Sequence, residues 1–372
     1  MHLLVVISSH GFGHTAQVAP VVNALRSRIP DLRLTLLTAA PRYILESRFD
    51  GPFEHIPEAD DIGMIMSSAV DILAEESACE YERFHRDWDR AVDRVAGRLC
   101  SLAPDLVLSN VSYRVLAAAA RSGIPAVALC SLNWADIYGH YCGDRPEAKV
   151  ILRQMLEAYN AADWFLQTEP SMPMATLHNR RPIGPIARLG RNRRAEIDAA
   201  LGLGERDRLV LVALGGIPMR LPMEAWPRLP DVRWVVQADW DVRRPDVVSL
   251  EALDMHFTDV LRSCDALITK PGYGSFAEAA CNGTRVLYVK RHDWPEEPFL
   301  VDWLHRHGRC LEVERDRLTR GRFDEELELL LDTPPAPRVE PRGIDEAADL
   351  LAARYAGVNG LHSGDAAAQS VR

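Results

Sequence analysis

The stretch that decides the fold is Leu3-Leu4-Val5-Val6-Ile7-Ser8-Ser9-His10-Gly11-Phe12-Gly13-His14. Its first five residues are apolar and predict a buried strand of a parallel sheet. The following residues, 16–28, carry apolar side chains at helical spacing. The two glycines therefore lie in a strand-to-helix turn. In such a turn a ligand can approach the backbone, and N–H groups can meet an anion.

Two imidazoles, those of His10 and His14, bracket the glycines of this turn. A dinucleotide-binding turn would show G-x-G-x-x-G, with an acidic residue about twenty positions later. Histidine has an unperturbed pKa near ~6.5, so it can take a proton from a hydroxyl at neutral pH. We predict His14, or failing that His10, as a general base, with Gly11 and Gly13 beside the ligand. The alternative is a structural role for both imidazoles at the end of the sheet.

Composition excludes several classes of protein. The chain has 372 residues, 47% of them hydrophobic and 26% charged, which is typical of a globular protein with two domains. A formal net charge of −10 argues against a nucleic-acid partner. No apolar run approaches the roughly 20 residues that span a bilayer. The seven cysteines form no C-x-x-C pair, so we expect reduced thiols, no metal site and a cytoplasmic protein, with peripheral membrane association left open.

Strand-like and helical segments alternate along both halves of the chain. This rhythm predicts an α/β fold of two Rossmann-like domains, 1–183 and 184–342. A Pro- and Gly-rich segment with six arginines, 179–194, is typical of a linker. Residues 64–102 predict one or two amphipathic helices. We expect a last helix at 343–356, which can pack back on the first domain, and a disordered tail at 357–372.

The second half contains a strand, 266–269, that runs into Lys270-Pro271-Gly272-Tyr273-Gly274-Ser275-Phe276-Ala277-Glu278 and then a helix. The start of a helix binds phosphate, and Lys270 adds a positive charge. We predict that Gly272, Tyr273, Gly274 and Ser275 hold a diphosphate and that Glu278 accepts hydrogen bonds from a ribose. The alternative is a tight turn followed by an ordinary helix. Gly215 and Gly216 follow another predicted strand and give a second close approach, although a Gly-Gly pair alone is weak evidence.

A third cluster, 292–299, follows the predicted strand 285–290. Ligands of open α/β sheets bind beyond the carboxyl ends of the strands, and the loop lies there. We predict that Glu296 and Glu297 accept hydrogen bonds from sugar hydroxyls. A solvated loop before a helix is the alternative. Asp239-Trp240-Asp241 has the form of a metal-holding D-x-D, but it stands beside two arginines and is interpreted as a surface loop.

Together these motifs resemble glycosyltransferases of the GT-B architecture, in which two Rossmann-like domains face each other across a cleft. The order of H-G-F-G-H at residues 10–14, N-W-A-D-I-Y at 133–138 and G-Y-G-S at 272–275, followed by E-E-P-F at 296–299, is similar to the glycosyltransferase-like half of plant L-arabinokinases. The layout is more distantly similar to the N-acetylglucosaminyltransferases that form lipid II. The resemblance extends to about residue 332, and it does not include the ATP-binding loop of the kinase half.

This resemblance implies an inverting, metal-independent transferase without a cofactor. Its donor would be a nucleoside-diphosphate sugar, UDP-linked, and its acceptor a small molecule or a lipid-linked one. Many inverting relatives orient the catalytic histidine with an aspartate. This chain has Asn110 at that place, and Asp136 is the alternative. Two further readings stay open: a nucleotide-sugar 2-epimerase of the same fold, and a non-catalytic module that binds a nucleotide sugar.

Overall fold

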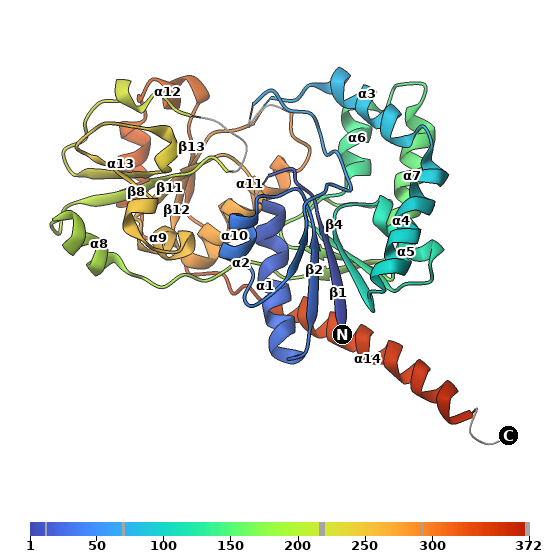
Figure 1. Ribbon diagram of the computed structural model, residues 1–372. Helices are drawn as coiled ribbons and strands as arrows, with labels where there is room; N and C mark the ends of the chain where they lie inside the picture. Colours follow the sequence, from blue (N-terminus) through green and yellow to red (C-terminus); the bar gives the residue numbers. More distant parts are fainter. Residues whose placement is uncertain (12, 69–70, 216–219, 292, 369–372) are drawn as a thin grey trace. The chain divides into compact units, whose positions relative to one another are not determined.

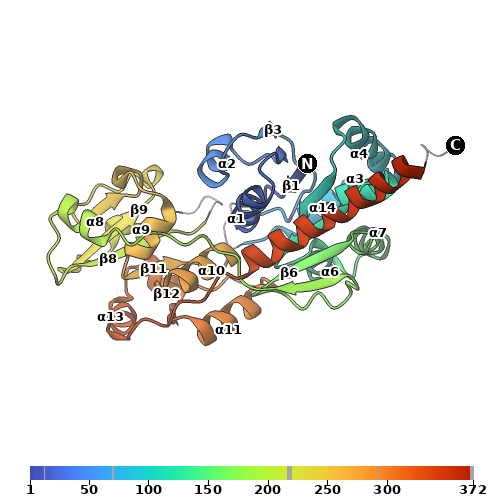
Figure 2. The same cartoon turned by 90° about the horizontal axis from the view of Figure 1, so that it is seen from below.

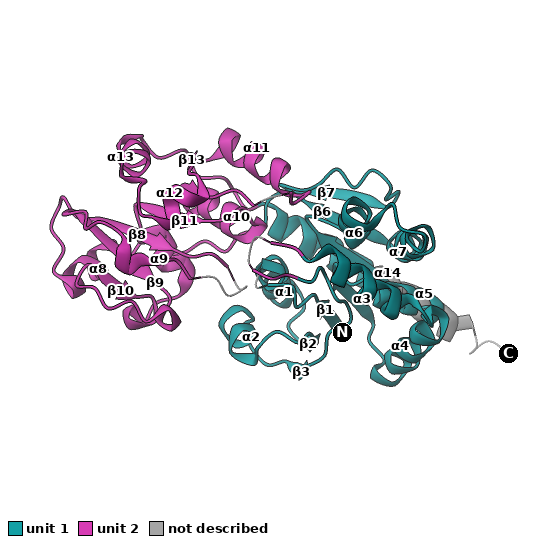
Figure 3. Ribbon diagram, turned by 90° about the horizontal axis from the view of Figure 1, so that it is seen from above, with its two compact units in different colours: residues 1–65, 73–186, 342–372 teal, residues 66–72, 187–341 magenta. Residues whose placement is uncertain are grey.

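The computed structural model describes residues 1–372 apart from 12, 69–70, 216–219, 292 and 369–372, and side chains after residue 356 are not part of the description. The chain forms two compact units (Figures 1 and 3). Unit 1 comprises Met1–Ile65, Leu73–Ile186 and Arg342–Arg372, and unit 2 comprises Met66–Ile72 and Ala187–Pro341. Each unit is a parallel sheet with helices, so the predicted α/β class with two Rossmann-like units is confirmed.

Unit 1 has a seven-stranded sheet of order β3-β2-β1-β4-β5-β6-β7 in which every pair is parallel. Its strands are β1 (His2–Ile7), β2 (Arg33–Leu37), β3 (Glu54–Ile56), β4 (Leu106–Asn110), β5 (Ala126–Cys130), β6 (Trp164–Thr168) and β7 (Arg180–Ile183). Its helices are α1 (Gly13–Arg28), α2 (Arg42–Arg48), α3 (Ala74–His85), α4 (Trp88–Leu102), α5 (Arg114–Arg121), α6 (Trp134–Cys142), α7 (Ala148–Asn160) and α14 (Gly343–Ala368).

The centre of this sheet places the ends of β1 and β4 side by side. All six residues of β1 and all five of β4 are buried, as a strand covered on both faces requires. The strand order reverses between β1 and β4, because β2 and β3 continue to one side of β1 and β5 to the other side of β4. Ligands of open α/β sheets bind at such a switch point. The turn before α1 and the end of β4 both lie there.

Helices α1 and α14 pack together over one face of the unit 1 sheet (Figure 2). The core of that face includes Val18 and Val22 of α1 together with Ala347 and Leu351 of α14. The small side chain of Ala347 allows the two helices to pack closely. The C-terminal helix is therefore a structural part of unit 1, although residues 187–341 separate it in sequence from the rest of that unit.

Unit 2 has a six-stranded parallel sheet of order β10-β9-β8-β11-β12-β13, with one apolar core on each face. The strands are β8 (Arg208–Val212), β9 (Val232–Val236), β10 (Val247–Ser249), β11 (Ala266–Thr269), β12 (Arg285–Tyr288) and β13 (Cys310–Glu312). The helices are α8 (Arg194–Leu201), α9 (Phe257–Ser263), α10 (Tyr273–Asn282), α11 (Glu297–His307), α12 (Arg315–Thr319) and α13 (Asp324–Asp332), with 3₁₀ turns at Met223–Ala225, Ala238–Trp240 and Glu251–Leu253.

The structure differs from the sequence-based expectations in several segments. Residues 179–194, expected as a linker, include the edge strand β7, where Pro182 is tolerated because an edge position leaves one side unpaired. The segment Met66–Ile72, expected in the first domain, belongs to unit 2, where the Arg315 guanidinium contacts both carboxylate oxygens of Asp71 at 3.2–3.3 Å.

Two helical segments also differ from expectation in extent. Residues 64–102 contain the two helices α3 and α4, but the part before Ala74 is not helical. Helix α14 is assigned to Gly343–Ala368, whereas the sequence predicts a helix at 343–356.

Candidate functional site

His14 lies in the first turn of α1, immediately after the glycine turn that follows β1. The side chain is 8% exposed. Its Nδ1 is 2.7 Å from Oδ1 of Asn110, the last residue of β4. Adjacent strand ends at the switch point therefore bring the imidazole and the amide together.

The amide of Asn110 is held in one orientation. Its Nδ2 donates to the carbonyl oxygen of Leu129 at 2.8 Å and to Oε1 of Gln17 at 3.1 Å, so Oδ1 faces His14. Because Oδ1 only accepts hydrogen bonds, Nδ1 of His14 carries the hydrogen and Nε2 keeps its lone pair. Burial lowers the pKa of His14 to about 4, against an opposing contribution from the Asn110 hydrogen bond. The imidazole is therefore neutral at pH 7 and can accept a proton at Nε2.

His10 and His14 both contact the ring of Trp134, the first residue of α6. The ring centroids lie 5.2 Å and 6.0 Å from that of Trp134. Nε2 of His10 is 3.1 Å from the carbonyl oxygen of Met64, so this nitrogen donates its hydrogen. Gly63 makes the position possible, since a Cβ there would lie 2.7 Å from Cδ2 of His10. His14 thus fits the role of base better than His10.

The glycines of this turn border open space. Gly11 has a φ of +93°, which favours glycine, and an added Cβ at Gly11 or Gly13 would meet no atom of the described residues within 4 Å, its chain neighbours apart. Phe12, between them, lies outside the described residues. Space beside the backbone is what close approach of a ligand requires.

Asp61 is a buried carboxyl that sequence reasoning missed. It accepts a hydrogen bond from Nε1 of Trp134 at 2.8 Å. Burial raises the pKa of Asp61 to about 6. The carboxyl thus fixes the indole against which both imidazoles pack. An acidic residue in the unremarkable run 58–61 gives no sequence signal for this position.

The sequence analysis considered Asp136 as an alternative partner of His14, but in the structure it pairs with Asn133. Its Oδ2 accepts from Nδ2 of Asn133 at 2.9 Å, while its backbone N–H donates to Oδ1 of Asn133 at 2.8 Å. This reciprocal pair caps the start of α6. Burial raises the pKa of Asp136. The residue that orients His14 is therefore Asn110.

In unit 2, Lys270 lies at the end of β11, close to the glycine turn after β8. Gly215 has a φ of +86°, and a Cβ there would lie 3.7 Å from Nζ of Lys270. Gly216 lies outside the described residues. Burial, with a smaller contribution from the Arg291 guanidinium, lowers the pKa of Lys270 to about 7. A nearby anion would favour the charged form of this amine.

Helix α10 begins at Tyr273, three residues after Lys270, with Gly272 as its N-cap in extended backbone conformation. The N–H groups of a first helical turn point out from the end of the helix and attract anions. Tyr273 and Gly274 are buried, and Ser275 is half-buried. Glu278 lies one turn further and is also buried. The predicted anion-binding residues of this segment are thus close together in space.

Glu296 and Glu297 lie at the start of α11 and are both buried. Glu297 accepts from the backbone N–H of Arg291 at 2.9 Å, and Glu296 accepts from Nε1 of Trp294 at 3.2 Å. The Arg291 guanidinium covers the Trp294 ring at 4.5 Å. Both carboxylates therefore hold groups of the loop before α11 in place. His292 lies outside the described residues.

Two features are absent from the described part of the chain. Among those residues, no group of three or more His, Cys, Asp or Glu side chains is arranged to hold a metal ion. None of the helices there is long and apolar enough to cross a membrane.

The fold and the two strand-to-helix turns define a protein with the GT-B fold of glycosyltransferases. The structure aligns with the glycosyltransferase of kitacinnamycin over 100% of this chain and 99% of that one, with a TM-score of 0.61 and 16% identity. It also aligns with UGT89C1 of Arabidopsis thaliana in complex with UDP, over 95% and 99% of the two chains, with a TM-score of 0.57 and 15% identity.

In sequence, the chain is similar to L-arabinokinase of Arabidopsis thaliana, with 25% identity over 351 residues. The match covers 93% of this chain and 33% of that protein, so the chain spans about a third of the length of the curated relative it matches. No family model matches. The resemblance to the L-arabinokinases read from the motifs is thus supported by the sequence comparison.

Proposed function

We propose that the protein is an inverting, metal-independent glycosyltransferase that moves a sugar from a UDP-linked donor to an acceptor hydroxyl. The acceptor oxygen forms a bond to the anomeric carbon as the bond from that carbon to the diphosphate oxygen breaks. The hydroxyl proton goes to Nε2 of His14, and the diphosphate leaves with the electron pair. Attack opposite the leaving group inverts the anomeric centre.

The observation that carries this proposal is the hydrogen bond between Asn110 and His14. It fixes the tautomer with the lone pair on Nε2, and burial keeps the imidazole neutral, which is the form that a general base needs. A purely structural histidine gains nothing from open space beside the two glycines of its turn. The amide orients the ring, although it cannot balance an imidazolium charge as a carboxylate would.

Unit 2 would supply the groups that stabilise the leaving diphosphate. The first turn of α10 and Lys270 provide positive potential without a metal ion, and Gly215 permits a close approach of the ligand. In this proposal Glu278 holds the ribose, and Glu296 and Glu297 bind sugar hydroxyls. The UDP complex of the Arabidopsis thaliana neighbour supports a uridine donor.

The acceptor in this proposal is a small molecule or a lipid-linked one. A cytoplasmic location is part of the proposal as well, since all seven cysteines are free thiols.

The proposal is tested first by ligand binding and then by turnover. A panel of nucleoside diphosphates and their sugars is screened for an increase in thermal unfolding temperature, because a ligand of the folded state raises stability. The stabilising donor is then incubated with hydroxylated small molecules and lipid-linked acceptors. We expect the product to have inverted anomeric configuration. His14→Ala should lower turnover by at least ~100-fold, while His178→Ala, an exposed control in unit 1, should not.

Other outcomes would replace this proposal. Conversion of the donor to its 2-epimer without an acceptor would identify a nucleotide-sugar epimerase. Tight donor binding without turnover on any acceptor would identify a binding module. Full activity of His14→Ala would remove this residue from the role of base.

A further inference from the structure

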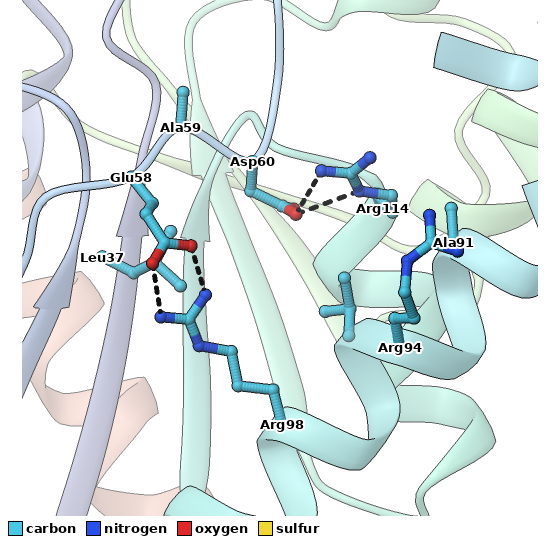
Figure 4. Close-up of a pocket in the computed structure, with 9 residues that line it drawn as sticks. Leu37, Glu58, Ala59, Asp60, Ala91, Arg94, Arg98 and Arg114 are labelled. Carbon is cyan, nitrogen blue, oxygen red and sulfur yellow. Dashed lines mark hydrogen bonds and ion pairs between the residues drawn. The ribbon is translucent and has the colours of Figure 1, made fainter.

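A pocket of about 220 Å³ lies in unit 1, apart from the groups to which the proposed function assigns roles (Figure 4). Three segments that follow parallel strands contribute to it: Leu37 ends β2, residues 58–60 follow β3, and Arg114 begins α5 after β4. The carboxyl ends of parallel strands are the usual location of ligands in such sheets. Its volume is below the ~300 Å³ at which drug-sized sites begin, so it suits a small molecule.

Helix α4 forms the opposite wall of the pocket with side chains at helical spacing. Ala91 and Val95 give apolar surface, while Arg94 and Arg98 bring guanidinium groups from the same face of the helix. Counting Arg114, three guanidinium groups meet two carboxylates. The pocket therefore combines a net positive charge with apolar walls.

Both carboxylates of the pocket are already paired. Glu58 forms a two-pronged contact with Arg98, in which Nη2 lies 3.1 Å from Oε1. Asp60 accepts from Nε of Arg114 at 3.1 Å and from the backbone N–H of Val115 at 3.0 Å, at the start of α5. Figure 4 shows these two pairs on either side of the pocket.

Arg94 is the remaining cation. The structure gives it no ion pair or hydrogen bond with any residue of the described ranges. Arginine recognises phosphate and carboxylate groups through two parallel N–H donors. An anion beside Arg94 would also meet the field of Arg98 and Arg114.

We propose that this pocket binds a small molecule with a phosphate group on a short carbon skeleton, read by Arg94 with Arg98 and Arg114. The phosphate oxygens accept hydrogen bonds from Arg94, and the carbon skeleton lies against Leu37, Ala59 and Val95. This site shares no lining residue with the diphosphate-binding residues assigned to unit 2, and its occupation does not depend on the proposed transferase activity.

The test measures binding of glycerol phosphate to the intact chain by calorimetry, with glycerol as the uncharged comparison. Arg94→Gln should weaken glycerol phosphate binding by at least ~10-fold. Arg90→Gln, an exposed control on the same helix outside the pocket lining, should stay within about twofold of the unaltered protein. Glycerol alone should not bind.

A gain of affinity gives the sharpest readout, because a misfolded variant cannot imitate it. Glu58→Gln removes the carboxylate that competes for Arg98, so glycerol phosphate should bind several-fold more tightly. Glu58 is well exposed, and loss of its ion pair costs little stability. Repeating the titrations with saturating UDP distinguishes the pocket from the donor site. Unchanged affinity in both Arg94→Gln and Glu58→Gln, or complete competition by UDP, would overturn the proposal.

Discussion

Replacing Asn110 by aspartate tests the structural account of His14 most directly. The variant places a carboxylate where Oδ1 now lies 2.7 Å from Nδ1 of His14. A carboxylate stabilises imidazolium, so the pKa of His14 should rise from its present value of about 4. Two unit charges about 4 Å apart attract by about 4 kcal/mol at an effective dielectric constant near 20. This corresponds to an increase of about 3 in the pKa at most, and burial of the new carboxylate reduces it to about 2.

The measurement is a histidine titration by NMR, which needs no substrate. In the unaltered protein the His14 signals should not titrate above about pH 5, since the pKa is about 4. In Asn110→Asp they should titrate between about pH 6 and 7. If the protein is a transferase with His14 as base, the acidic limb of kcat/KM should move by the same amount.

The substitution also costs stability, and this cost needs a control. The substitution removes the two hydrogen bonds that Asn110 donates to Leu129 and Gln17, which should lower the free energy of unfolding by about 1–3 kcal/mol. Asn179 likewise donates to two carbonyl oxygens, at 2.9 Å and 2.8 Å, so Asn179→Asp should destabilise comparably without altering the His14 titration. A His14 pKa near 6.5 in the unaltered protein, or no increase in Asn110→Asp, would refute the reasoning.

Three further predictions concern Gly63, Lys270 and divalent metal ions. Gly63→Ala should lower the free energy of unfolding by about 1–3 kcal/mol in chemical denaturation, because its Cβ would meet His10 at 2.7 Å and its φ is +57°. An added Cβ at Gly97, within α4, would meet no atom of the described residues within 4 Å, so Gly97→Ala should instead raise the free energy of unfolding by about 1 kcal/mol. Equal effects of the two substitutions would contradict the close contact between Gly63 and His10. Lys270→Met should weaken UDP binding by at least ~10-fold in calorimetry, while Lys149→Met on α7 leaves it unchanged. Removal of divalent metals by a chelator should leave sugar transfer within about twofold, and loss of activity restored by magnesium would contradict the metal-independent mechanism.

Local sequence patterns predicted the central elements of both sheets well. The predicted strands 3–7, 266–269 and 285–290 correspond to β1, β11 and β12, although β12 ends at Tyr288. Each has four or more mostly buried residues followed by turn signals, so periodicity identifies them. The strands β3, β10 and β13 have only three residues each, and β7 contains a proline. Pairing with a neighbouring strand, and not local preference, makes these segments strands.

The candidate site was predictable only in part, because its contacts join distant parts of the chain. His14 stands out beside its glycines, and Asn110 can be suggested from the end of a strand. The orientation of the Asn110 amide depends on Gln17 and Leu129, which no local pattern connects. Asp61 gives no signal at all, because its contact with Trp134 joins residues 73 positions apart.

An amide beside His14 has a chemical consequence for the proposed reaction. A base with a pKa of about 4 is too weak to remove a proton from a free hydroxyl before bond formation. The hydroxyl becomes strongly acidic only once its oxygen has begun to bond to the anomeric carbon. Proton transfer to Nε2 must therefore accompany or follow the attack of the acceptor oxygen on the anomeric carbon. The proposed reaction then depends more on the electrophilicity of that carbon than it would in a site with a carboxylate beside the histidine. The departure of the diphosphate then governs the barrier, which places the greater catalytic demand on Lys270 and the first turn of α10.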